Sequence, residues 1–163
     1  MLSINKNKNK NKNKNKNKNK NINQNQNQFI YQIINDKAYI FCNVRKKFIF
    51  LTPEEWVRQH ILEFLIKEKK YYALSIEKMI VSFPIKRRVD IIVYYKSKPW
   101  ILVECKAPRV LLTKKILDKV IFYNLHLNCP YLMLSNGIFH YFCKTEDSTK
   151  TISFLKTLPS FGE

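Results

Sequence analysis

Three charged side chains interrupt two apolar stretches near the middle of the chain: Asp90, Glu104 and Lys106. A charge inside a buried strand is costly unless an ion pair or a metal ion compensates it, so each needs a reason for its position. Side chains alternate along a strand, so Glu104 and Lys106 point to one face and Cys105 to the other. If the two stretches pair as a hairpin, Asp90 comes close to the same edge. The sequence therefore predicts two carboxylates and one ammonium group that converge on one point.

The residues around these charges favour such a hairpin. Residues 87–108 read RRVDIIVYYKSKPWILVECKAP. Residues 89–95 are rich in β-branched and aromatic side chains, a polar turn follows at 96–99, and residues 100–105 predict the second strand.

A helix is predicted on either side of this hairpin in the sequence. The first begins at Thr52, a good N-cap, with proline and two acids in its first turn. Glu55 also completes a capping box with Thr52. The second is predicted in residues 109–128, with Thr113 as a candidate N-cap.

Further segments predict strands, because they are rich in β-branched or aromatic residues and are bounded by turn signals. They are residues 29–34, 38–44, 46–51, 75–83, 131–135 and 138–143, with a weaker one at 151–155. After the N-terminal hairpin the predicted order is α-β-β-β-α-β-β. The strand at Tyr131 follows a helix, so we expect it to run parallel to a neighbour. The expected fold is α/β (α+β), a mixed central sheet flanked by helices.

Composition divides the chain into three parts. Residues 1–28 are almost wholly Asn, Lys and Gln, and such a segment predicts a disordered arm. Residues 29–145 have the composition of one domain, and residues 146–163 resemble a surface tail.

The net charge of the chain is +18. Without the eight lysines of the Asn-Lys repeat, the chain still has 22 Lys and Arg against 12 Asp and Glu. This excess favours a polyanionic partner such as DNA, although A/T-rich codons would enrich lysine too.

Other compositional features limit the class of protein. There are four cysteines, no CxxC pair, no signal segment and no apolar run of membrane-spanning length, which predicts a cytoplasmic protein with reduced thiols and no membrane contact. With two glycines in the chain, no nucleotide-binding motif is present, so no nucleotide cofactor is expected. The pairs His126/Cys129 and His140/Cys143 do not have a usual zinc spacing, and packing explains them better.

The spacing of the three charges resembles a known pattern. Asp, thirteen residues and then Glu-x-Lys is the arrangement of the PD-(D/E)xK nucleases. The wider wording is similar to the N-terminal nuclease domain of type I restriction enzyme R subunits, over about residues 50–145. The segments that carry the resemblance are PEEWVRQ, KRRVDIIVYY, PWILVECKAP, FYNLHL and YLMLSNGIFHYF.

The resemblance implies a restriction-endonuclease-like core and a metal-dependent DNA endonuclease. Mg²⁺, or Mn²⁺ in its place, would be held by Asp90, Glu104 and the Cys105 carbonyl. Lys106 would orient the attacking water or stabilise developing charge. In this fold the first helix usually supplies another acid. Glu55 matches that position best, with Glu54 second, Glu77 third, and capping the alternative role for both helix acids.

The same resemblance suggests the residues that contact DNA. They are Arg58 and Gln59 on the first helix, Arg87 and Arg88 beside Asp90, and Lys119 and Tyr123 on the second helix. Relatives often carry glutamine where this chain has Lys119, which leaves open a catalytically weak or inactive nucleic-acid-binding protein. A protein-binding role is a third reading. Some nucleases of this fold cut both strands as dimers, so a homodimer is also open.

Overall fold

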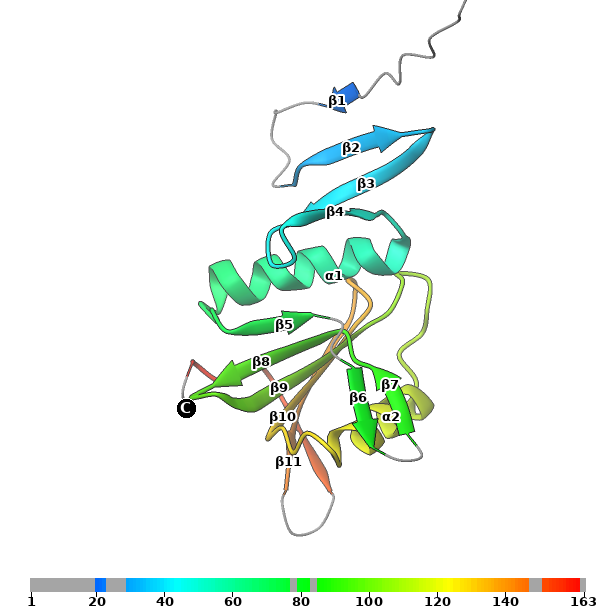
Figure 1. Cartoon of the computed structure of the whole chain (residues 1–163). Coiled ribbons are helices and arrows are strands. Elements are labelled where there is room, and N and C mark those ends of the chain that lie inside the picture. The colour runs from blue at the N-terminus through cyan, green and yellow to red at the C-terminus, as the bar shows by residue number, and fades with distance from the viewer. Residues whose placement is uncertain (1–19, 23–28, 77–78, 83–84, 147–150, 162–163) are drawn as a thin grey trace, which may run out of the picture.

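The computed structural model describes residues 20–22, 29–76, 79–82, 85–146 and 151–161. Three sheets and two α-helices are present in this part of the chain. Helix α1 (Pro53–Glu63) lies between an N-terminal sheet and a larger central sheet (Figure 1). A π-helical turn, η1 (Phe64–Glu68), follows it directly. No described helix is long and apolar enough to cross a membrane.

The N-terminal sheet is antiparallel, in the order β1-β2-β3-β4. Its strands are β1 (Lys20–Ile22), β2 (Tyr31–Ile34), β3 (Lys37–Cys42) and β4 (Lys47–Phe50). The predicted hairpin is confirmed, and its turn residues Asn35 and Asp36 have φ of 48° and 59°, as a two-residue turn requires. Of the predicted disordered arm, Lys20–Ile22 pairs with β2, and the rest lies outside the described residues.

The central sheet has six strands in the order β12-β11-β10-β9-β8-β5. Their bounds are β5 (Leu74–Ile76), β8 (Ile91–Tyr95), β9 (Lys98–Cys105), β10 (Tyr131–Ser135), β11 (His140–Thr145) and β12 (Ile152–Leu155). β9 and β10 are parallel, and helix α2 (Lys114–Asn124) lies between them in the chain. The other neighbours are antiparallel, so the predicted mixed sheet is confirmed.

The two helices cover opposite faces of the central sheet. Val57 and Ile61 of α1 share a buried cluster with Val103 of β9, whereas Val120 and Tyr123 of α2 share another with strand residues on the opposite face. Ile101, Leu102 and Val103 of β9 alternate between the two clusters, as the pleat requires. The core therefore consists of two apolar layers separated by the sheet.

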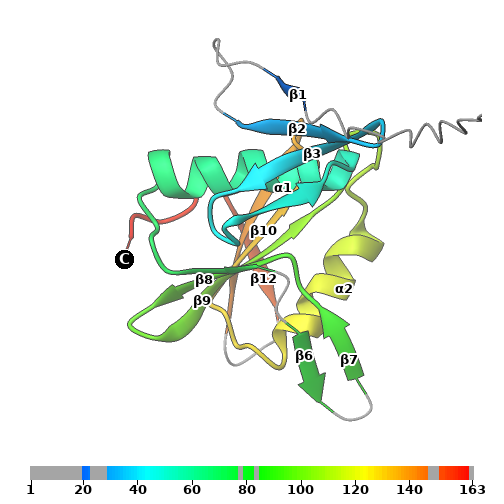
Figure 2. The same ribbon diagram turned by 45° about the horizontal axis from the view of Figure 1, so that its top comes forward.

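The segment before the β8–β9 hairpin differs from the prediction. A single strand was expected at residues 75–83, but the chain forms β5 in the central sheet and then β6 (Met79–Ser82). β6 pairs with β7 (Ile85–Arg88) in a separate hairpin that lies beside α2 (Figure 2). β7 reads IKRR, and such a basic segment does not suit a sheet buried on both faces. The order after α1 is thus β5-β6-β7-β8-β9-α2-β10-β11-β12.

The C-terminal segment is more integrated than a surface tail. β12 extends the central sheet beyond β11, and the Leu158 side chain is 1% exposed in the core beneath α1. Lys69 Nζ donates to the Leu158 carbonyl at 2.8 Å, and Tyr71 Oη donates to the Pro159 carbonyl at 2.5 Å. Phe161 then packs edge-on against Trp100. An irregular segment can be buried without sequence periodicity, so its packing was not visible in the sequence.

Candidate active site

The candidate site lies where the parallel strands β9 and β10 end. The Lys106 backbone N–H donates to the Ser135 carbonyl at 2.8 Å, which holds the two strand ends together. Clefts outside the carboxyl ends of parallel strands are the usual ligand sites of sheets that contain them. Asp90 directly precedes β8, and the Cys105 backbone N–H donates to Asp90 Oδ2 at 2.7 Å. The hairpin therefore brings Asp90 beside the peptide that joins Glu104 to Cys105.

Glu104 is buried and carries one side of an ion pair. Its side chain shares a sheet face with Leu102, the face covered by α2. Lys106 Nζ lies 2.5 Å from Glu104 Oε1 and 3.1 Å from the Cys105 carbonyl oxygen. Burial and the nearby charge of Asp90 raise the pKa of Glu104, and they outweigh the opposite effect of Lys106. The site therefore disfavours the charged form of Glu104 beside Asp90.

Lys106 is a charged group held in a fixed position. Burial alone would lower its pKa, but the hydrogen bond and charge of Glu104, with smaller contributions from Asp90 and Glu54, raise it. The ammonium group stays protonated well above neutral pH, and its contacts with the Glu104 carboxylate and the Cys105 carbonyl fix its position.

Arg58 reaches this site from α1. Its Nη2 donates to Asp90 Oδ1 at 2.6 Å, and its Nη1 forms an ion pair with Glu55 Oε2. The Arg58 residue is 5% exposed. Burial would lower its pKa, but the charges of Asp90 and Glu55 raise it, so the guanidinium is a permanent cation. Arg58 therefore links α1 to the carboxylate before β8.

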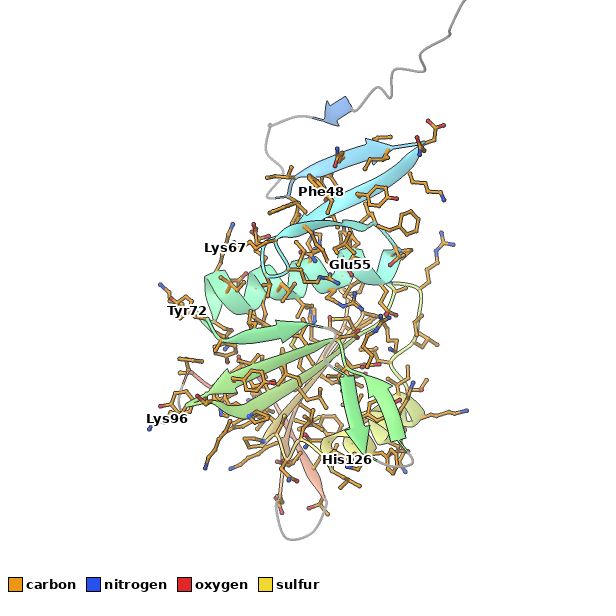
Figure 3. All side chains as sticks on the ribbon, viewed as in Figure 1. Phe48, Glu55, Lys67, Tyr72, Lys96 and His126 are labelled. Carbon is orange, nitrogen blue, oxygen red and sulfur yellow. The ribbon has the colours of Figure 1, made fainter. Side chains whose placement is uncertain are left out.

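Glu55 belongs to a different cluster. Its carboxylate receives Arg45 Nη2 and Arg58 Nη1, and Gln59 Nε2 donates to its Oε1 at 2.7 Å. Arg45 comes from the β3–β4 turn, so Glu55 joins α1 to the N-terminal sheet, and Figure 3 marks it on the helix beside that sheet. Its backbone N–H also donates to Thr52 Oγ1 at 3.0 Å, which confirms the predicted cap. Three side-chain donors thus bind a carboxylate that the sequence assigned to the active site.

Glu54 is the acid of α1 that lies open beside the site. Its side chain is 41% exposed, and Arg58 Nη2 lies 3.5 Å from its Oε1. Its charge contributes to the raised pKa of both Lys106 and Cys105, which places it within electrostatic reach of the end of β9. Glu77, the third candidate, lies outside the described residues.

The predicted DNA contacts fall into two groups. Lys119 is exposed, with Nζ 5.5 Å from the Tyr123 ring centre, and its charge acts on Glu104. Arg88 is also exposed. By contrast, Arg58, Gln59 and Tyr123 are 5%, 3% and 5% exposed and pack inside the domain. The side chain of the sixth, Arg87, lies outside the described residues.

The site offers few oxygen donors to a divalent cation. Among the described residues, no group of three or more His, Cys, Asp or Glu side chains is arranged to hold a metal. Mg²⁺ is often held by only one or two carboxylates, together with water and substrate phosphate. Asp90, Glu104 and the Cys105 carbonyl supply that minimum set of oxygens, and burial followed by the charge of Asp90 raises the pKa of Glu104. These oxygens are of the type that a hard divalent cation prefers.

Among the described residues, neither His/Cys pair belongs to a group of side chains that could hold a metal. Cys129 and Cys143 are buried in the layer beneath α2, whereas His126 is exposed. His140 Nδ1 is 2.9 Å from Ser135 Oγ, and burial lowers the pKa of this imidazole. Packing and this hydrogen bond account for their positions.

Comparison with known proteins identifies the family. A family model described as the Type I restriction enzyme R protein N terminus matches residues 53–159. The chain belongs to this family. The match confirms the resemblance read from the sequence, and it begins with α1, so it includes all the described candidate residues but not the N-terminal sheet or Arg45. Neither the curated proteins nor the solved structures gave a match.

The residue that holds Glu55 beside the site, Arg45, was not predicted. It lies in a turn, ten residues before the Glu55 carboxylate that it binds. No helical or strand periodicity connects such positions, so only the packing of the N-terminal sheet on α1 reveals the contact.

Proposed function

We propose that this restriction-enzyme-related domain is a metal-dependent DNA endonuclease that hydrolyses phosphodiester bonds. The observation that carries the proposal is that Asp90 accepts from the Cys105 N–H at the end of β9, next to Glu104, whose carboxylate binds Lys106 and is influenced by the charge of Asp90. Membership of the restriction enzyme R family supports the same reading. Ionisable groups with displaced pKa values at strand ends are typical of catalytic sites.

Asp90, Glu104 and the Cys105 carbonyl would hold Mg²⁺ or Mn²⁺. The bound cation would supply Lewis acidity, because it neutralises phosphate charge and lowers the pKa of water. Asp90 is oriented by the Cys105 N–H, and Glu104 is kept in place by Lys106. Lys106 is a donor that remains protonated, and it would position the attacking water or stabilise charge on the phosphate.

Glu54 fits the role of the helix acid better than Glu55. The Glu54 carboxylate is partly exposed and close enough to affect Lys106, whereas Glu55 is buried under three donors. DNA would approach over Lys119 and Arg88, which are exposed cations from α2 and β7. Such contacts neutralise phosphates and set the register of the duplex.

A nucleic-acid-binding protein without efficient cleavage is the second candidate. The Arg58 guanidinium on Asp90 Oδ1 favours it, because this cation occupies an oxygen that a metal would use. Both candidates predict DNA binding that weakens with salt, and only the first predicts strand cleavage.

A cleavage assay with matched variants tests the proposal. Wild type, Asp90→Asn and Lys106→Ala are incubated with plasmid and linear DNA, in Mg²⁺, Mn²⁺ or EDTA. The controls are Asp36→Asn, in the β2–β3 turn, and Lys144→Ala, which lies on β11 opposite the start of β10, far from the strand ends that carry the site. We expect cleavage by the wild type and both controls, only with metal, and none by the site variants. A wild type that binds DNA but never nicks it supports the second candidate instead.

A further inference from the structure

Arg58 is the point at which the two acidic clusters meet. One of its nitrogens pairs with Glu55, and another contacts Asp90 at 2.6 Å and Glu54 at 3.5 Å. The guanidinium is almost fully buried between α1 and the end of β9. A buried cation with this many carboxylate neighbours does more than position one side chain.

The charges around Asp90 are balanced without a metal ion. Arg58 compensates Asp90 and Lys106 compensates Glu104, so each candidate metal ligand has a protein cation on one of its oxygens. Both oxygens of Asp90 are engaged, Oδ1 by Arg58 and Oδ2 by the Cys105 N–H. A divalent cation must therefore share or displace the Arg58 contact, and it meets the repulsion of the guanidinium in either case.

Arg58 is also prevented from moving far away. Glu55 holds the Nη1 side of the guanidinium, and Glu55 is itself fixed by Arg45 and Gln59. The anchor lies on the side of α1 where Arg45 of the N-terminal sheet binds. The positive charge thus remains near Asp90 even when the direct contact is released.

We propose that Arg58 is the counter-ion of the metal site: it balances Asp90 in the metal-free domain and limits how tightly the site binds a divalent cation. This inference rests on the proposed function, since it assumes that Asp90 and Glu104 hold the cation. It assigns Arg58 a positioning and electrostatic role, in place of the direct DNA contact expected from the sequence. It also reconciles the observation that favours a binding-only protein with an active nuclease.

Calorimetric titration of Mn²⁺ into the full chain measures the effect directly, without DNA or turnover. The variants are Arg58→Gln, which removes the charge, Arg58→Lys, which keeps it, and Lys144→Gln as a distant charge-matched control. We expect Arg58→Gln to bind Mn²⁺ about tenfold more tightly than wild type, because a unit positive charge beside the ligand oxygens is removed. Arg58→Lys and the control should remain within about threefold of wild type.

Two further variants separate a failure of the proposed function from a failure of the counter-ion role. Asp90→Asn should abolish Mn²⁺ binding; if the wild type binds no Mn²⁺ either, the proposed function fails at its metal site. If the wild type binds and Asp90→Asn does not, yet Arg58→Gln equals wild type or binds more weakly, the counter-ion role alone is wrong. The double variant Glu55→Gln/Arg58→Gln removes both members of the buried pair. It should reproduce the tighter binding if Arg58→Gln alone fails to fold.

Discussion

Two carboxylate clusters lie at opposite sides of Arg58, and they are built differently. Around Glu55, three side-chain donors from α1 and the β3–β4 turn surround one acid. Around Glu104, one ion pair with Lys106 supports an acid whose pKa is raised by burial and by Asp90. Both acids are less than 7% exposed, so burial alone does not separate them.

The difference lies in how many donors bind each carboxylate. Glu55 accepts from three side chains, and a metal ion would have to break those bonds. Asp90 and Glu104 each have one protein cation, and no other side chain of the described residues donates to Glu104, so a divalent cation has fewer contacts to displace there. The number of donors, rather than residue type or burial, separates the structural acid from the candidate catalytic acids in this domain.

The largest expected effect is on stability, at Glu55. Glu55→Ala leaves Arg45 and Arg58 without the carboxylate that they share, and we expect a loss of about 3–5 kcal/mol in the free energy of unfolding. Glu54→Ala removes a partly exposed partner and should cost less than about 1 kcal/mol. Urea unfolding followed by circular dichroism measures both. Equal losses would mean that the two acids do not differ as the contacts indicate.

The same two acids can also be compared by their effect on DNA cleavage instead of stability. Glu54→Gln should lower kcat/KM for DNA cleavage by about 10- to 100-fold while leaving the unfolding midpoint nearly unchanged, because the side chain is near the site and only partly buried. The folded fraction of the Glu55→Gln variant should retain more DNA-cleavage activity than the Glu54→Gln variant. The reverse ranking would restore Glu55 as the acid of the helix.

Sequence could predict those parts of the site that depend on local rules. Alternation along β9 places Glu104 and Lys106 on one face, and hairpin pairing brings Asp90 beside them. The parallel pairing of β9 with β10 followed from the helix between them. These are properties of neighbouring residues and of chain connection, so the sequence carries them directly.

The choice between Glu54 and Glu55 could not be predicted in the same way. Both stand in the first turn of α1, and which one faces the site depends on the rotation of the helix about its axis. That rotation is fixed by the packing of Val57 and Ile61 on the sheet and by the N-terminal sheet on the other side. The capping bond at Thr52 uses the backbone N–H of Glu55, and the Thr52 N–H donates to the Phe50 carbonyl, so the reciprocal half of the predicted capping box is not formed and the cap does not distinguish the two acids.

A smaller effect on the free energy of unfolding is expected at Glu104, because the charged form that would bind a metal is the form that destabilises the fold. The pKa of Glu104 is raised in the folded state, so its ionised form destabilises the fold. The contribution of protonated Glu104 to the free energy of unfolding is complete below the ordinary glutamate pKa and is lost as pH rises through the raised pKa. Glu104→Gln should therefore increase the free energy of unfolding by about 1 kcal/mol at neutral pH. The gain should vanish in acid below the ordinary glutamate range.

Adding Mn²⁺ at neutral pH sharpens this prediction. The cation should raise the melting temperature of the wild type, since it binds the folded state, and should have little effect on Glu104→Gln. A variant that is less stable than wild type at neutral pH would show that the Lys106 ion pair dominates over burial and the charge of Asp90.

The smallest expected effect is on DNA binding at Lys119. This lysine is exposed on α2, and its charge reaches Glu104, so it lies at the rim of the candidate site. If it neutralises one phosphate, Lys119→Gln should lower the slope of log K against log salt by about one and weaken binding equally for all sequences. Fluorescence anisotropy over a range of salt concentrations measures the slope, with Lys67→Gln as a control because Lys67 is paired with Glu63 on the far end of the first helix. An unchanged slope would remove Lys119 from the DNA path and confine its influence to the electrostatics of Glu104.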